Sequence, residues 1–385
     1  MNIPPRILLS TLFAMTLVQA RAASERIYIG TYTNNGPSLG VYTLTLDTSS
    51  GALSKAVPVA ELRNPSFLAL NPVKPVIYAT CELAGPDGSP IGGLTALAMN
   101  PATGDLRPLD QRTIAGKSAP CHVIVDPSGR AVLAAQYNEA IVSSFPVLAD
   151  GSLGPIGSIV HHAGKTGPNV ARQEHPHAHS FSISPDGRYA FACDLGMDRI
   201  VAYRLDAAKG TITPEPELDA KADPGAGPRH SKFSADARYF YVVTEMTGTV
   251  EVYSYDAPTG RLARIQTLSA LPEGFTGFNG SAEIKISPDG RFVYASDRGP
   301  DLIAVFARNP QTGLLTPVEQ VSCGGKHPRN FALSSDGRWL VCANRDTNNL
   351  AVFRVDDLSG RLTMISNNTE VPQAVCVLFV PPSGS

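Results

Sequence analysis

Charged side chains are scarce in this chain of 385 residues, and neither sign of charge dominates. They make up 17% of the residues, and 32 Lys and Arg against 34 Asp and Glu give a formal net charge of -2. Such a chain has no long-range electric field that would attract nucleic acid or an anionic membrane. We therefore expect neither of them as a partner.

Sequence motifs for cofactor chemistry are also missing. The chain has no phosphate-binding loop, no dinucleotide fingerprint and no Cys-x-x-Cys-His haem site. We expect no cofactor, and we do not expect a serine hydrolase. Its six cysteines show no Cys-x-x-Cys spacing, which argues against zinc clusters and thioredoxin-like chemistry. Cys81, Cys193 and Cys342 each lie late in an apolar run, so we expect them to be buried.

Long apolar runs are absent from the body of the chain, but one near the N-terminus has the features of a signal peptide. Arg6 supplies positive charge, residues 7–18 are apolar, and Ala20-Arg21-Ala22 offers the small residues that signal peptidase needs. An uncleaved anchor is the alternative, although the run is short for a bilayer. We expect residues 1–22 to be a signal peptide and residues 23–385 to form one periplasmic or secreted domain.

What the chain does contain is a periodic series of turns, drawn from 34 Gly and 32 Pro. A turn followed by an apolar residue occurs seven times, and its glycine recurs about every fifty residues. Gly accepts the positive φ that such turns need. The seven turns are Ser50–Leu53, Thr103–Leu106, Asp150–Leu153, Lys209–Ile212, Thr259–Leu262, Thr312–Leu315 and Ser359–Leu362.

A second series of turns falls between the first. In one repeat this turn is Ser287–Gly290, in which Pro fixes φ at the second position. Apolar runs Glu283–Ile286 and Phe292–Ser296 flank it, and Leu302–Phe306 and a strand after Leu315 complete the repeat. A repeat of about fifty residues with four strands is typical of a propeller blade.

The two ends of the chain are complementary. After residue 22 the chain begins with runs that correspond to the second and third strands of a repeat, Arg26–Thr31 and Val41–Leu46. It ends in a single run, Val375–Val380, with the character of a first strand. Pairing these ends completes a blade and removes two free sheet edges. The sequence therefore predicts an all-β, seven-bladed β-propeller of four-stranded blades; a two-sheet sandwich with accidental repeats is the alternative.

Blade topology gathers polar residues at one mouth of the central channel. The first strand of each blade starts at the mouth where the second strand ends, and the Ser-Pro-Asp-Gly turns lie on the opposite face. Two longer connections, residues 163–175 and 273–280, reach the same mouth. Structural ion pairing is the alternative for any single residue, but the set predicts a site. Its members include His122, His177, His179, Arg229, His230, Glu283 and Arg329 at strand starts, and Glu82, Asp194, Glu245, Asp297 and Arg298 at strand ends.

At these residues the sequence resembles the propeller lactonase family, which contains bacterial 6-phosphogluconolactonases and fungal carboxymuconate lactonizing enzymes. The resemblance covers nearly the whole chain after the signal peptide. The matching stretches are Tyr28–Thr33, Arg172–Ser180, Gly227–His230 and Ala295–Gly299. The run Arg-Gln-Glu-x-Pro-His-x-His-Ser is the specific one, because many propellers carry Ser-Pro-Asp-Gly turns.

The resemblance implies lactone chemistry without an obligatory metal, at a His, arginines and a Glu. The matching positions are His179, Arg229, Glu245 and Arg298, with Arg329 as a further arginine. A neutral His can take a proton from water near pH 7, and Arg can hold an oxyanion, phosphate or carboxylate. We expect His179 to be the general base and Glu245 to orient it or supply a proton. The residues expected to bind substrate or support the site are His122, Arg172, Glu174, His177, His230, Glu283 and Arg329.

Other functions stay open at this stage. The expected substrate is a small lactone, acted on by a monomer, although a signal peptide is unusual for a cytosolic sugar-phosphate pathway. A lactone-forming cycloisomerase acting on a muconate-like diacid and a non-catalytic binding propeller are the alternatives. His177 and His179, alternate residues of one strand, are a further candidate for a zinc or copper site, with His175 or His122 as third ligand; we expect no metal.

Overall fold

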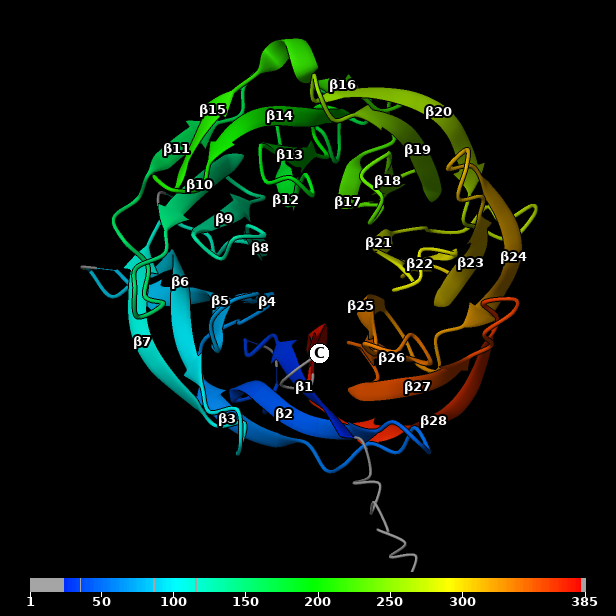
Figure 1. Ribbon diagram of the computed structural model, residues 1–385, viewed down its shortest axis with the longest axis horizontal. Coiled ribbons are helices and arrows are strands. Elements are labelled where there is room, and N and C mark those ends of the chain that lie inside the picture. Colours follow the sequence, from blue (N-terminus) through cyan, green and yellow to red (C-terminus); the bar gives the residue numbers. More distant parts are fainter. Residues whose placement is uncertain (1–23, 35, 86, 115, 382–385) are drawn as a thin grey trace, which may run out of the picture.

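A computed structural model describes residues 24–34, 36–85, 87–114 and 116–381 as a ring of seven β-sheets. The sheets surround a central channel like the blades of a propeller (Figure 1). The all-β, seven-bladed propeller predicted from the turns is confirmed. The signal peptide expected at residues 1–22 lies outside the described residues.

Each blade has four antiparallel strands that follow one another outward from the channel. The innermost strands are β29 (Ala374–Val380), β4 (Leu68–Leu70), β8 (His122–Val125), β12 (Ala178–Ile183), β17 (Pro228–Phe233), β21 (Ser281–Ile286) and β25 (Pro328–Leu333). The second strands are β1 (Ser24–Thr31), β5 (Val76–Ala84), β9 (Ala131–Gln136), β13 (Tyr189–Asp194), β18 (Tyr239–Thr244), β22 (Phe292–Asp297) and β26 (Trp339–Asn344).

The third and fourth strands form the outer part of the ring. The third strands are β2 (Gly40–Asp47), β6 (Pro90–Met99), β10 (Ile141–Pro146), β14 (Arg199–Asp206), β19 (Thr249–Asp256), β23 (Leu302–Arg308) and β27 (Asn349–Val355). The outermost strands are β3 (Val57–Glu61), β7 (Leu106–Thr113), β11 (Ser158–His161), β15 (Thr211–Pro214), β20 (Arg261–Ser269), β24 (Leu315–Ser322) and β28 (Leu362–Glu370). A short 3-10 helix, η1 (Pro216–Leu218), precedes β16 (Ala220–Lys221), which also pairs with β14.

The two ends of the chain share the first blade, as the sequence predicts. The C-terminal strand β29 pairs antiparallel with β1, from Arg26 opposite Val380 to Thr31 opposite Ala374. The pairing gives the first blade its innermost strand and closes the ring. The last strand of the chain therefore borders the channel, beside the label C in Figure 1.

The hydrophobic core is divided among the gaps between neighbouring blades. Seven clusters of buried side chains each draw on two adjacent blades, and one of them joins the seventh blade to the first. Because a middle strand has a neighbouring blade on both faces, β13 and β22 are buried along their whole lengths. The outermost strand β20 instead alternates between exposed and half-buried residues. Packing against both neighbours keeps the blades in a fixed ring.

The periodic glycines lie where an aromatic side chain of one blade meets the next blade. Gly151 has φ of 91°, and its carbonyl accepts a hydrogen bond of 2.8 Å from the hydroxyl of Tyr78. The hydroxyl of Tyr241 donates to the carbonyl of Gly313 in the same way, at 2.8 Å. A Cβ on Gly51 would lie 2.3 Å from the ring of Trp339. These turns therefore need Gly both for the backbone angle and for close packing.

Three of the cysteines are buried, as the sequence predicts. Cys81, Cys193 and Cys342 are fully buried, and all six cysteines are unpaired thiols. Within the described part of the chain, no helix has the length and apolar character needed to cross a membrane.

Candidate functional site

A cavity of about 480 Å³ opens at one mouth of the channel, the mouth where the innermost strands begin. Six of the predicted site residues line it: Glu82, Arg172, His179, Glu245, Arg298 and Arg329. They come from five blades and one connecting loop, so distant parts of the chain meet here. We call this place the channel mouth.

A recurring β-bulge turns the strand starts toward the channel. In the fourth blade Ala178 pairs with Asp194 and Ser180 with Cys193, which leaves His179 outside the pairing. The same shift leaves out Arg229 in the fifth blade and Arg329 in the seventh. A bulge re-aims the side chain of its extra residue. Three of the predicted residues thus occupy one special backbone position.

Glu245 is the centre of the charged groups. It follows the end of β18, and its Oε2 lies 2.8 Å from Nε of Arg229 and 3.1 Å from Nη2 of Arg298. Its Oε1 accepts a hydrogen bond of 2.5 Å from Arg172. Burial alone would raise the pKa of Glu245, but the three guanidinium groups hold that pKa far below its ordinary value. Glu245 is therefore ionised and has no proton to donate, which removes one of the two roles expected for it.

The sequence predicted that Arg229 contacts the substrate. Its side chain instead lies behind the residues that line the cavity. It is 1% exposed, and its guanidinium also donates to the carbonyl of Ala282. Burial and the nearby Arg298 lower its pKa, yet it keeps its charge because a guanidinium has an intrinsic pKa above 12 and Glu245 is in contact with it. Its place makes it a support for Glu245.

His179 is the imidazole at the cavity wall. It is 4% exposed, and its Nδ1 has no hydrogen-bond partner within the described residues. Burial lowers the pKa of His179 well below 6.5, and the charge of Arg229 lowers it further. The ring is therefore neutral at pH 7 and has a lone pair to accept a proton.

A second polar group lies further along the innermost strands, beneath the lining of the cavity. Oε2 of Glu283 lies 3.2 Å from Nδ1 of His230 and 3.6 Å from Nζ of Lys285. His122 accepts a hydrogen bond of 3.3 Å from the backbone of Phe181. Burial lowers the pKa of His230 to about 4. His122, His230 and Glu283 were expected to bind substrate or support the site; none lines the cavity, and each contacts the neighbouring inner strands.

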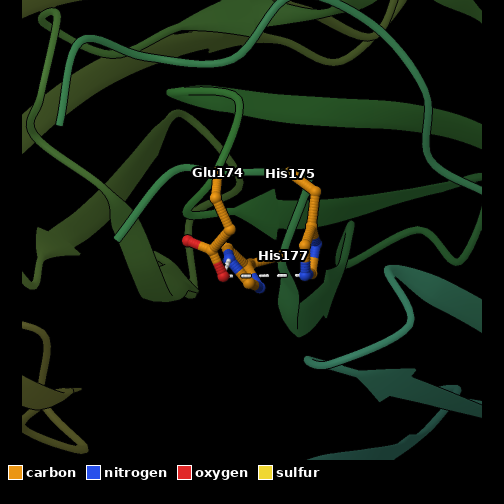
Figure 2. Close-up of side chains that lie close together, drawn as sticks. All are labelled: Glu174, His175 and His177. Atoms are coloured by element: carbon orange, nitrogen blue, oxygen red, sulfur yellow. Dashed lines mark ion pairs between the residues drawn. The ribbon is translucent and has the colours of Figure 1, made fainter. Parts of the chain in front are cut away.

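Glu174 and His177 form a separate cluster with His175 beside the channel mouth (Figure 2). The ring of His177 stacks on Tyr137, with centroids 4.2 Å apart. Among the described residues, this is the one group of three side chains that fits a metal ion, and it does not include His179. The structure thus separates the two histidines that alternation along one strand would place together.

Several polar residues near the mouth brace the fold. Asp194, at the end of β13, accepts hydrogen bonds from Nδ1 of His162 at 2.6 Å and from the backbone N–H of His177 at 2.9 Å.

Residues 36–40 have the sequence Gly-Pro-Ser-Leu-Gly, which matches the pattern of a nucleophile elbow. Ser38 is buried between two strands and hydrogen-bonded to Thr31 at 2.6 Å, without the strand-to-helix turn of such an elbow.

Sequence reasoning missed two tyrosines of the cavity. Tyr137 follows the end of β9, and its hydroxyl accepts a hydrogen bond of 3.3 Å from Arg172. Tyr32 follows β1, and the guanidinium of Arg329 lies 5.4 Å from its ring centroid. Both occupy the topological position of Glu245, directly after the second strand of a blade. The position directly after a second strand, which pointed to Glu245 in the sequence, therefore also marks these two aromatic residues.

Comparison with known proteins identifies the family of this propeller. Residues 26–379 match the family described as "Lactonase, 7-bladed beta-propeller". A 6-phosphogluconolactonase of Bacillus subtilis is 40% identical over 353 residues, which cover 92% of this chain and 97% of that protein. A 6-phosphogluconolactonase of Formosa agariphila is 31% identical over 310 residues, 80% of this chain and 86% of that protein.

A solved structure adds a neighbour that is described as periplasmic. The periplasmic gluconolactonase of Pseudomonas aeruginosa superimposes with a TM-score of 0.86 at 33% identity, covering 94% of this chain and 100% of that one. The family match spans nearly all of the described propeller, and the charged channel mouth lies within it. The chain belongs to the lactonase family of seven-bladed β-propellers.

Proposed function

We propose that the channel mouth hydrolyses a sugar-type lactone, with His179 as general base and the arginines as the binding site for negative charge. The observation that carries this proposal is the imidazole of His179 in the wall of the cavity that Arg172, Arg298 and Arg329 also line. Lactone hydrolysis needs an acceptor for a proton of water and a stabiliser for an oxyanion. Both are present within this single opening.

The charge balance at the mouth supports an anionic substrate or transition state. Glu245 is shared by Arg172, Arg229 and Arg298. Arg329 makes no ion pair with a carboxylate within the described chain. These four arginines thus have a single shared carboxylate, Glu245, which leaves the group with a net positive charge. Guanidinium groups bind carboxylate and phosphate oxygens through paired hydrogen bonds.

The steps follow from these positions. Water attacks the lactone carbonyl while His179 takes one of its protons, and a tetrahedral oxyanion forms next to Arg298 and Arg329. The bond between the carbonyl carbon and the ring oxygen then breaks. The imidazolium of His179 returns its proton to the departing alkoxide, which gives the open hydroxy acid. Because Glu245 is ionised, the proton for the leaving group comes from His179.

Glu245 acts in this scheme by holding the arginines. Its two oxygens contact Arg172 from the loop, Arg229 from β17 and Arg298 after β22. Without that shared carboxylate, the like charges would repel one another and the guanidinium groups would lose their fixed places. Arg229 is a positioning residue for Glu245 and keeps the pKa of His179 low.

The substrate class is that of the relatives, a six-membered sugar lactone with or without a phosphate. Two relatives are named 6-phosphogluconolactonase, and a structural neighbour is named a periplasmic gluconolactonase. The features of a signal peptide at residues 1–22 favour export and thus a lactone available outside the cytoplasm.

A panel of lactones tests this proposal. Purified protein is given gluconolactone, its 6-phosphate and a muconolactone, and acid release is followed against the spontaneous rate. We expect acceleration with the sugar lactones, because both present the ring ester that His179 and the arginines serve. No acceleration with either sugar lactone would contradict the proposal, and closure of a muconate to its lactone would assign the cycloisomerase alternative.

A further inference from the structure

We propose that Glu174, His175 and His177 bind one divalent metal ion of the Zn²⁺ class at the side of the channel mouth. Figure 2 shows the carboxylate of Glu174 and the two imidazole rings directed toward one another. Their three candidate ligand atoms lie within 4.8 Å of one another. The ion would touch no reacting atom of the proposed lactone chemistry, so this inference goes beyond that function.

Both imidazoles have one nitrogen already occupied by a backbone carbonyl. Nδ1 of His175 lies 2.7 Å from the carbonyl oxygen of Pro176, and Nδ1 of His177 lies 3.1 Å from that of Tyr137. A carbonyl only accepts, so each Nδ1 carries the hydrogen, and Nε2 of the neutral ring carries a lone pair. Histidines that bind metals in proteins are oriented in this way, by a carbonyl or carboxylate on the other nitrogen.

The three candidate ligand atoms face one another, and Glu174 pairs with both imidazoles through one oxygen. Oε1 of Glu174 lies 3.3 Å from Nε2 of His177 and 3.6 Å from Nε2 of His175. The side chain of His177 is 3% exposed, and its Nε2 makes no hydrogen bond within the described residues. A buried acceptor without a donor is costly. A cation placed among these atoms would satisfy all three.

The spacing and the ligand types select the class of ion. A tetrahedral ion with bonds of about 2.0–2.1 Å separates neighbouring ligands by about 3.4 Å, close to the two distances above. Two imidazoles and one carboxylate with a water in fourth place suit Zn²⁺, whereas Mg²⁺ and Ca²⁺ prefer oxygen ligands alone. Glu174 and His175 are partly exposed, so they can adjust to the ion and leave a path for its entry.

The ion would hold the end of the loop that carries Arg172, where the chain enters the fourth blade. Glu174 and His175 end this loop, and His177 stacks on Tyr137, whose hydroxyl accepts a hydrogen bond from Arg172. Gln173 already ties the loop to the backbone of Leu195 at 2.9 Å. A metal two residues beyond Arg172 would fix its contact with Glu245. The ion therefore has a positioning role at the channel mouth.

Calorimetric titration of the full mature protein with ZnCl₂ after chelator treatment tests the proposal. We expect one ion per chain and a rise in melting temperature, because the ion binds the folded form. Replacing either accessible ligand, in Glu174→Gln or His175→Ala, should weaken binding by at least about 10-fold. A Co²⁺ titration should give visible absorption bands of a tetrahedral site in the wild type, and these bands should be lost in both variants.

The matched control is His161→Ala, since His161 is an exposed histidine on β11 of the third blade. This variant should bind Zn²⁺ as the wild type does. Absence of binding at one equivalent, or binding that Glu174→Gln and His175→Ala leave unchanged, would overturn the proposal. The titration needs no lactone, so failure of the lactone assay would leave this result standing.

Discussion

The chemistry of the channel mouth depends on how the surroundings change one imidazole. Burial and nearby positive charge keep His179 neutral, which leaves it ready to accept a proton but makes it a weaker base than a free His. An anionic substrate would offset the charge of the arginines and strengthen that base when it binds. The same arginines keep Glu245 ionised. One cluster of charges thus sets the protonation state of both residues.

The pH dependence of activity follows from this environment. His179 has a pKa lowered well below 6.5, so its unprotonated form persists as the pH falls, whereas an ordinary His would be half protonated at pH 6.5. We expect kcat/KM for a sugar lactone to stay constant from pH 7.5 down through 6.5. Glu245, whose pKa is also lowered, stays ionised over that range. Circular dichroism at each pH controls for unfolding, and a loss of activity with a midpoint near 6.5 would contradict this assignment.

At the scale of single elements, the two faces of the ring carry different local structures. At the channel mouth, bulges release His179, Arg229 and Arg329 from the strand pairing. At the opposite face, turns with positive φ receive an aromatic side chain from the preceding blade, as Gly151 receives Tyr78. The bulges position the side chains of the channel mouth, and the turns hold one blade against the next. The two kinds of structure lie on opposite faces of the ring, one strand length apart.

That separation predicts a variant that changes stability alone. Tyr78→Phe removes the hydroxyl that donates to the carbonyl of Gly151 and leaves that buried carbonyl without its partner. We expect the free energy of unfolding to fall by about 1–2 kcal/mol in urea denaturation. The kcat/KM of the folded variant should equal that of the wild type, because Tyr78 does not line the cavity. A large loss of activity in the folded variant would contradict this division of roles.

The repeats could be predicted from the sequence because the conformation of a tight turn depends on a few adjacent residues, as in the Gly turns and the Ser-Pro-Asp-Gly turns. The closure of the ring could be predicted because Val375–Val380 has a strand partner only when the two ends of the chain pair. The bulges could not be predicted, because one extra residue such as His179 reverses the alternation along a strand. That reversal is why His177 lies with His175 and away from His179.

At the scale of the whole molecule, closure of the ring creates the site. The cavity takes Tyr32 from the first blade, Tyr137 from the third, His179 from the fourth, Glu245 from the fifth and Arg298 from the sixth. None of these blades holds enough of the cavity to bind a lactone alone. Because each blade packs on two neighbours, the ring fixes the distances among groups that are far apart in sequence. A rigid scaffold of this kind keeps catalytic groups in place.

The most direct test of this account is the kcat/KM of His179→Gln with the better of the two sugar lactones. The account predicts a fall of about 10²- to 10⁴-fold, because the general base is removed, with a circular dichroism spectrum like that of the wild type. His161→Gln, which changes an exposed histidine, should keep full activity. A folded His179→Gln protein with kcat/KM within about twofold of the wild type would contradict the central claim.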